Sequence, residues 1–377
     1  MPIAPVDDDD TVLYYEDSGA PDGSVDYATI VLIHGMLFHG AVFRRLIPYA
    51  ALHNVRLVFV NMRDYPGSSR FSPEELKAIA SSDRETQAKA IKALGLQISA
   101  FLVHIIKKCD IPKFTEENGK KKGGLALLGW SLGNLVSMSM LGNAGTLPDD
   151  TKDFLERYLR TVVMYDPSNT SLGESPPERV YNPLRDPALT LEQRGKLFLT
   201  TISRYMTAIP DPSSVTEEAL NARTSLHEAP AGTAMDASKS PTVSRMTPSE
   251  FDSVTDYDAL ERSNELLRHV AREVYNDNFR RALLDTGGVW KDVRVLYVWC
   301  DMSVSDCIWA TKQVARRLEE VGKQDSRMVQ FERLTGANHF VSFPVLDGSL
   351  LADLIVYAKQ AHWDDPENVV QLLAANI

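Results

Sequence analysis

The sequence predicts an α/β fold, a doubly wound and mostly parallel sheet that is covered by helices on both faces and interrupted by a helical insertion. Short apolar, β-branched runs alternate with helix-period stretches along most of the chain, as is typical of parallel sheets that are buried on both faces. The alternation stops between about residues 171 and 288. With 377 residues, 44% hydrophobic and 24% charged, the chain suffices for one large domain with an insertion, or for two domains.

The individual elements follow from these patterns. The apolar runs that predict buried strands are 29–35, 56–61, 125–129, 161–166, 293–300 and 328–334. The stretches with helical spacing are 85–108, 131–141, 308–321 and 347–361. We therefore expect a core in two parts, residues 1–170 and 289–377, which are separated by a helical insertion at residues 171–288.

The insertion is predicted to be helical and to cover a binding site. Thr190 and Gln193 form a capping-box pattern, residues 256–284 have helical apolar spacing, and the Pro/Ser/Thr-rich residues 209–249 indicate irregular structure. Open α/β sheets bind ligands at the carboxyl ends of their strands. An insertion that leaves the sheet there is expected to be a lid rather than a structural decoration.

Charge and cysteine content limit the classes of function. A net charge of −11 argues against binding to nucleic acid or to an anionic membrane surface. We see neither a signal region nor an apolar run long enough to span a bilayer. Cys109, Cys300 and Cys307 are odd in number and lack zinc-type spacing, which predicts a cytoplasmic protein without a metal. The acidic run 7–10 is interpreted as a solvated tail rather than a metal site.

The stretch "LALLGWSLGNLV", residues 125–136, places Ser131 between an expected strand and an expected helix. Such a serine is often only a helix N-cap. Gly129 and Gly133 favour another interpretation, because a sharp strand-to-helix turn brings the backbone so close that side chains at these positions would clash. The turn would expose the hydroxyl group beside free helix N–H groups. Ser131 is therefore the candidate nucleophile.

A candidate general base follows the last expected strand. His339 lies in "RLTGANHFVSFP", where a histidine can reach a serine on a neighbouring strand. An isolated loop histidine would more often only bond to the backbone. None of the other seven histidines follows a strand in this way, although His34 and His39 lie in the loop after the first expected strand.

Two backbone amides are expected to form an oxyanion hole. One belongs to Leu132, directly after the serine, and the other to Met36, in the loop that Gly35 allows to turn. The alternative for Gly35 is an ordinary turn glycine. Together with the apolar helices of the insertion, residues near the elbow predict a hydrophobic, partly enclosed pocket, with these residues at its wall: Gly35, Phe38, His39 and Trp130.

Three aspartates are candidates for the acid. In this architecture the acid commonly lies three residues past a glycine that ends the last strand but one, which is expected here at 293–300. Here Cys300 occupies the glycine position and Ser303 the acid position. Asp166 ends the strand after the serine helix, from which a carboxylate can also reach a histidine. Asp166 is therefore placed ahead of Asp301 and then Asp306, which are near but out of register.

The order HG, GxSxG, Asp, His, with a helical insertion before the strand that precedes the base, resembles the α/β-hydrolase fold family over about residues 12–362. Narrower stretches resemble a group of fungal α/β-hydrolases of mostly undefined substrate: "NMRDYPGSS", "YDPSNTSLGESPP", "YNPLRDP" and "LTGANHF". An acid on the strand after the serine helix is similar to the arrangement in some haloalkane dehalogenases and resorcylic-lactone hydrolases. Serine instead of aspartate at the elbow implies acyl chemistry.

The resemblance implies a serine hydrolase that cleaves an ester or lactone of a medium-sized apolar small molecule. Ser131, His339 and Asp166 would form its triad, without metal or organic cofactor. The same triad could serve lyase, acyl-transfer or cyclisation chemistry, and a non-catalytic small-molecule binder is a further alternative. The intact pair of Ser131 and His339 argues against a pure binder. The oligomeric state does not follow from the sequence.

Overall fold

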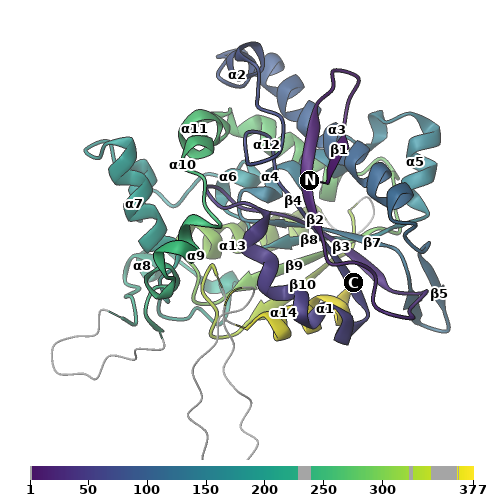
Figure 1. The fold of residues 1–377 in the computed structure, drawn as a ribbon. Helices are drawn as coiled ribbons and strands as arrows, with labels where there is room; N and C mark the ends of the chain where they lie inside the picture. The colour runs from purple at the N-terminus through teal and green to yellow at the C-terminus, as the bar shows by residue number, and fades with distance from the viewer. Residues whose placement is uncertain (1, 228–238, 322–325, 341–362, 364) are drawn as a thin grey trace, which may run out of the picture.

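The computed structural model describes residues 2–227, 239–321, 326–340, 363 and 365–377. Figure 1 shows a central sheet with helices on either side of it. The helix expected at residues 347–361 lies outside the described part of the chain.

Eight strands form the main sheet, in the order β1-β2-β4-β3-β7-β8-β9-β10. All neighbours from β4 to β10 are parallel, whereas β1 with β2 and β2 with β4 are antiparallel. The predicted fold class is confirmed, and two strands at the amino-terminal edge are added to it. In sheet order the strands are Ile3–Pro5, Val12–Asp17, Val55–Val60, Ala28–Ile33, Leu125–Trp130, Leu159–Tyr165, Arg294–Cys300 and Val329–Leu334. A separate hairpin pairs β5 (Thr115–Glu117) with β6 (Lys120–Lys122).

Helices cover both faces of the sheet. Figure 1 shows α3, α4 and α12 on one side and α1 and α14 on the other. Helix α13 packs against β9, and α5 packs against β8. The bounds of these helices are Ile47–Ala50 (α1), Arg84–Lys108 (α3), Gly133–Gly142 (α4), Asp149–Glu156 (α5), Arg272–Phe279 (α12), Ser305–Val321 (α13) and Pro366–Asn376 (α14). A short α2, Pro73–Ile79, precedes α3.

Helix α3 differs from the expectation that no apolar run is long enough to span a bilayer. By length and composition alone, its 25 residues could cross a membrane. In the fold, 56% of its most apolar stretch of 18 residues is buried inside the molecule, and the helix packs along α4. A buried core helix passes the same test of length and composition, so this helix is weak support for a membrane span.

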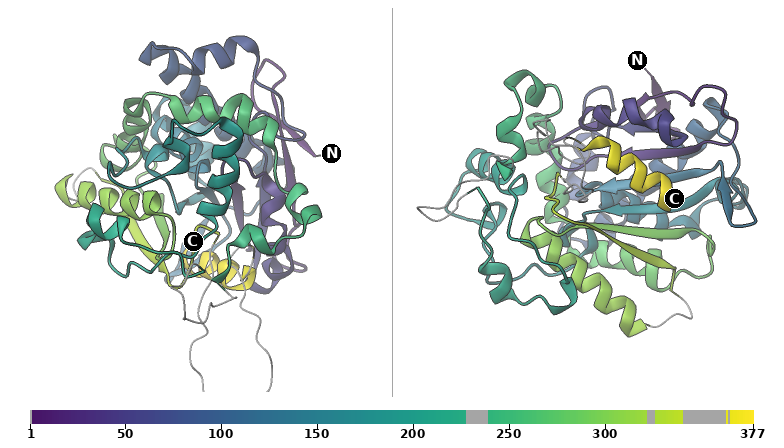
Figure 2. Two further views of the ribbon diagram at one scale, coloured as in Figure 1. Left: turned by 90° about the vertical axis from the view of Figure 1, so that its left-hand side faces the viewer. Right: turned by 90° about the horizontal axis from the view of Figure 1, so that it is seen from below.

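The segment between β8 and β9 contributes no strand to the main sheet among its described residues. Most of its helices lie at one end of the sheet, as the right view of Figure 2 shows. Thr190 caps α7 with both hydrogen bonds of the predicted capping box. Besides α12, the helices of this segment are Asn169–Leu172 (α6), Leu191–Ile202 (α7), Glu217–Asn221 (α8), Pro248–Asp252 (α9), Tyr257–Ala259 (α10) and Glu265–His269 (α11).

The helical pattern at residues 256–284 is not one continuous helix. Two π-helical turns, Leu260–Asn264 and Arg280–Leu284, interrupt it. Val270 and Ala271 adopt extended backbone between α11 and α12. The break is stabilised because the backbone N–H of Ala271 donates to the side chain of Gln87 in α3 instead of to a preceding turn.

Candidate active site

Ser131 lies on the sharp turn between β7 and α4 that the sequence predicts. Its φ angle is 52°, a left-handed conformation that is strained for serine. A Cβ atom on Gly129 would lie 2.7 Å from Ser137 Oγ and 2.9 Å from the backbone of Asn134, and one on Gly133 would lie 2.6 Å from the carbonyl oxygen of Ile33. Close backbone approach therefore requires both glycines.

Asp166 and His339 meet beside this turn. His339 Nδ1 and Asp166 Oδ2 are 2.6 Å apart, and both side chains are buried. The same carboxylate oxygen accepts a hydrogen bond of 2.5 Å from Ser303 Oγ, and Oδ1 accepts one of 3.2 Å from the amide of Cys300. Three donors therefore hold this carboxylate in place beside the imidazole. Among the described residues, Asp166 is the only carboxylate that bonds to this imidazole.

The two alternative acids have other partners. Asp301 forms an ion pair of 2.7 Å with Arg333 and accepts hydrogen bonds from the amides of Gly336 and Ala337. It thereby fixes the loop that leads to His339 without touching the ring. The other candidate, Asp306, lies on helix α13 and bonds to residues of the segment between β8 and β9.

The two expected oxyanion donors lie together. Met36 and Leu132 line the same cavity as Ser131, and neither amide donates a hydrogen bond to another described residue. Behind them, His34 has one ring nitrogen 2.9 Å from the Gly35 carbonyl oxygen, and its Nε2 accepts a hydrogen bond from the amide of Met62. Burial lowers the pKa of His34 to about 3, so this histidine is neutral and serves the structure of the loop.

Phe38 and Trp130 belong to an aromatic cluster behind the site. Trp130 packs against Phe38, His339 and Phe340 with inclined ring planes and ring centroids 5.3–5.8 Å apart. Its Nε1 donates to the carbonyl oxygen of His339 at 3.2 Å. The residues that line the cavity do not include Gly35, Phe38, His39 or Trp130, which the sequence predicts at the pocket wall. Phe38 and Trp130 are fully buried, Gly35 packs against Ser131, and His39 is only half-buried.

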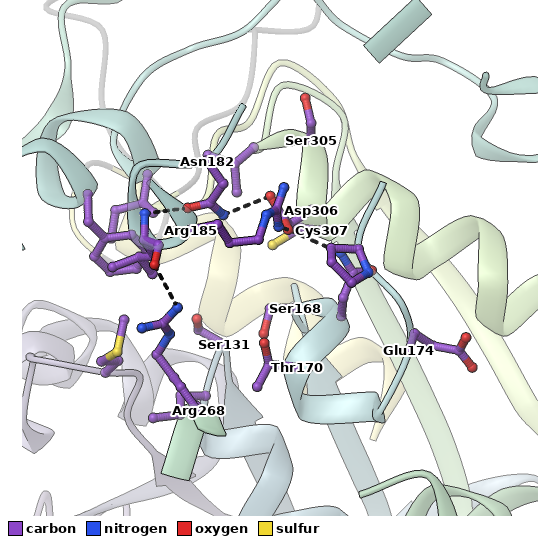
Figure 3. A pocket seen from close by; sticks show the side chains of 18 of the residues that line it. Ser131, Ser168, Thr170, Glu174, Asn182, Arg185, Arg268, Ser305, Asp306 and Cys307 are labelled. Atoms are coloured by element: carbon purple, nitrogen blue, oxygen red, sulfur yellow. Dashed lines mark hydrogen bonds and ion pairs between the residues drawn. The ribbon is translucent and has the colours of Figure 1, made fainter. Parts of the chain in front are cut away.

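A cavity of about 810 Å³ opens above Ser131 and His339. Its wall is not purely apolar. Apolar side chains such as Phe198 and Ile202 alternate with arginines from the segment between β8 and β9, as Figure 3 shows in part. The four arginines are Arg185, Arg194, Arg268 and Arg272.

One ion pair crosses the cavity wall. Arg185 contacts the carboxylate of Asp306 at 2.6 Å, and Asn182 and Asn169 donate to the same carboxylate. Figure 3 shows Asn182, Arg185 and Asp306 together, with Ser131 across from them in this view. Asp306 thus ties the segment between β8 and β9 to helix α13, and it is not the partner of His339.

Comparison with known proteins identifies the family of this chain. The sequence model described as "Alpha/beta hydrolase family" matches residues 30–354. The chain belongs to the α/β-hydrolase family. No curated protein matches the sequence. This membership supports a hydrolase activity in general terms.

Solved structures resemble this α/β-hydrolase at low identity. A bromoperoxidase from Bacillus anthracis is 12% identical, with a TM-score of 0.43, and 90% of this chain and 92% of that chain are covered. An esterase from Exiguobacterium antarcticum is 13% identical, with a TM-score of 0.46 and coverage of 89% and 91%. A lipase-esterase related protein from Clostridium acetobutylicum is 12% identical, with a TM-score of 0.46 and coverage of 97% and 99%.

The site of this α/β-hydrolase also contains a thiol that the sequence analysis did not place there. Cys307 Sγ lies 3.6 Å from His339 Nδ1, and burial raises the pKa of Cys307 well above its usual range. Asp166, Cys307 and His339 together offer three metal-ligand atoms within 4.8 Å of one another. They do not fit an ion, because the 2.6 Å between Nδ1 and Oδ2 is a hydrogen-bond distance, shorter than that between two ligands at about 2.0–2.2 Å from a tetrahedral zinc.

Proposed function

We propose that this α/β-hydrolase is a serine hydrolase that cleaves a carboxylic ester or a lactone. The observation that supports it most is the buried hydrogen bond between Asp166 and His339 beside the strained turn of Ser131. A buried carboxylate that accepts from Nδ1 holds the imidazole in the tautomer whose Nε2 can take a proton. Ser131 and His339 line the same cavity, so substrate can reach both of them.

In the proposed mechanism, His339 Nε2 takes the proton of the Ser131 hydroxyl group as its oxygen attacks the carbonyl carbon. The amides of Met36 and Leu132 donate to the oxyanion that forms. The imidazolium, which Asp166 stabilises, then gives its proton to the leaving oxygen, and an acyl-enzyme remains. Water attacks this ester with His339 as base, the acid product leaves, and Ser131 recovers its proton.

The cavity supports a medium-sized substrate. A volume of about 810 Å³ lies in the range of pockets that take small molecules. The wall carries both apolar side chains and arginines, so we revise the expectation of an apolar substrate to one that also carries polar groups. In this proposal the segment between β8 and β9 is a lid over the cavity, because its residues form most of the wall.

The proposed function predicts covalent labelling of one residue. A fluorophosphonate probe, whose phosphorus the activated serine attacks, is expected to label the protein stoichiometrically at Ser131. Peptide mapping by mass spectrometry identifies the site. A parallel assay with p-nitrophenyl esters of graded chain length and several lactones is expected to show turnover. Absence of both labelling and turnover would contradict the proposal, and labelling at another residue would displace Ser131.

A further inference from the structure

The loop that carries one oxyanion donor is held by the segment between β8 and β9. Directly after Met36, the amide of Leu37 donates to Tyr65 Oη at 2.9 Å and to Asn264 Oδ1 at 3.2 Å. Leu37 has a φ of 71°, which is disfavoured for a leucine. Hydrogen bonds from outside the loop therefore hold Leu37 in this conformation.

Further bonds from the same segment extend along the loop. The carbonyl oxygen of Leu37 accepts from the amide of Asp256 at 2.8 Å, and the amide of His39 donates to the carbonyl oxygen of Val254 at 3.0 Å. An antiparallel bridge joins Phe38 to Thr255 between them. We call Val254, Asp256 and Asn264 the loop clamp. The N–H of Leu37 thus binds Tyr65, on the loop after β4, and Asn264, and its carbonyl oxygen binds Asp256. Asn264 and Asp256 lie more than 200 positions away in the sequence.

Asn264 binds the loop through its side chain, whereas Val254 and Asp256 bind it through their backbone atoms. It is buried, with 1% of its surface exposed, and it ends the π-helical turn Leu260–Asn264. Tyr65 Oη lies 2.6 Å from Asn264 Oδ1. Burial raises the pKa of Tyr65 above its usual range, so the hydroxyl group keeps its proton and donates it to Asn264. This donation leaves an Oη lone pair free to accept from Leu37.

The conformation of Leu37 determines where the Met36 amide points. The φ angle of Leu37 is a rotation about its N–Cα bond, which moves the preceding peptide, and Met36 with it, relative to the residues that the loop clamp holds. Relaxation of Leu37 to a negative φ would therefore move the Met36 N–H away from Ser131. An oxyanion-hole donor acts only when it lies at about 2.7–3.1 Å from the developing charge.

We propose that Asn264 is a positioning residue for the oxyanion hole, through which the segment between β8 and β9 keeps the Met36 amide directed at the reacting carbonyl. This role rests on the proposed function. It assigns the segment a part in stabilising the transition state in addition to covering the cavity.

The test replaces Asn264 with leucine, which is similar in size and cannot accept a hydrogen bond. We expect kcat for the best p-nitrophenyl ester to fall by about ten- to a hundredfold, with KM within about threefold, because the donor acts on the transition state. The ratio of ester to thionoester turnover is expected to fall as well, since sulfur accepts hydrogen bonds weakly and gains less from the hole. Loss of fold stability alone would not move this ratio.

Asn278→Leu is the matched control. Asn278 is also a buried asparagine of the segment between β8 and β9, and it bonds to Asn143 and Arg281 rather than to the loop. We expect it to lower the melting temperature without changing the ratio. If Asn264→Leu does not fold, Tyr65→Phe provides the second variant, with a smaller fall of the ratio because Leu37 keeps its bond to Asn264.

The outcomes are distinct. An unchanged ratio in folded Asn264→Leu, or in Tyr65→Phe where that variant is used, overturns the positioning role while wild-type turnover upholds the serine hydrolase. An equal fall of the ratio in Asn278→Leu also overturns it, since the effect would then be general loosening. A wild-type protein without turnover or fluorophosphonate labelling overturns the proposed function and the positioning role together.

Discussion

Ser131→Ala is expected to lower ester turnover by several orders of magnitude, on the scale of triad removal in known serine proteases. The hydroxyl oxygen of Ser131 is the atom that forms the acyl-enzyme in the proposed mechanism, and alanine offers no substitute. The change removes one oxygen from a side chain that is only half-buried, so the fold should persist. Steady-state kinetics with the best p-nitrophenyl ester, together with circular dichroism, measure both effects.

Ser168→Ala is the control for this experiment. Ser168 also lines the cavity, but its backbone is extended, with a φ of −89°. Among the described serines, Ser131 is the only one with a positive φ. We expect turnover of Ser168→Ala within about tenfold of wild type. Ser131→Ala that keeps more than about a tenth of the wild-type rate would contradict the triad.

Asp166→Asn is expected to be nearly as damaging, with a loss of kcat on the order of ten-thousandfold, as measured for the same change in a serine protease. Asparagine keeps the size of the side chain, but its amide can donate to Nδ1 and so favours the wrong tautomer of His339. It also removes the charge that stabilises the imidazolium. KM should change less than kcat, because Asp166 does not line the cavity.

Asp301→Asn and Asp306→Asn separate the three candidate acids. Neither side chain contacts His339, so we expect kcat of each variant within about tenfold of wild type. Asp301→Asn breaks the ion pair with Arg333 and should lower the free energy of unfolding by about 1–3 kcal/mol, which urea denaturation measures. If instead Asp301→Asn were crippling and Asp166→Asn mild, the acid would lie after β9 rather than after β8.

Ser303→Asp is expected to rescue part of the activity of Asp166→Asn. Ser303 Oγ lies 2.5 Å from Asp166 Oδ2, so a carboxylate at position 303 reaches the region of His339 Nδ1. We expect at least about a tenfold recovery of kcat in the double variant, since a carboxylate again holds the imidazole. Ser303→Asn in the same background is the control. Equal turnover in both double variants would mean that position 303 cannot serve as the acid.

Local patterns explain why much of the fold and the serine turn could be predicted. Strands β3, β4, β7, β8 and β9 are mostly apolar and buried, because helices cover both faces of the sheet. Each of these strands can therefore be recognised from its own residues. The turn at Ser131 depends on two glycines within five residues. For both features, the residues that determine the structure are close together in the sequence.

The rest depends on contacts between distant segments. Whether Asp166 or a residue after β9 bonds to His339 depends on which of two neighbouring parallel strands delivers the carboxylate, and sequence order does not decide this. Phe38 and Trp130 are near Ser131 in the chain or in the sheet, but packing against Phe340 turns them away from the cavity. The bond from Leu37 to Asn264 spans 227 positions and has no local signature.

The indole of Trp130 lies against the ring that changes its charge during the proposed reaction. Its plane is inclined by 34° to the imidazole of His339, and the ring centroids are 5.5 Å apart. A cation at this distance interacts with the π-electrons of an indole, so gain of a proton by His339 changes the electronic environment of Trp130. We therefore expect the fluorescence of Trp130 to respond to the proton that His339 gains in the proposed mechanism, and Trp130→Phe identifies its share of the signal among the five tryptophans.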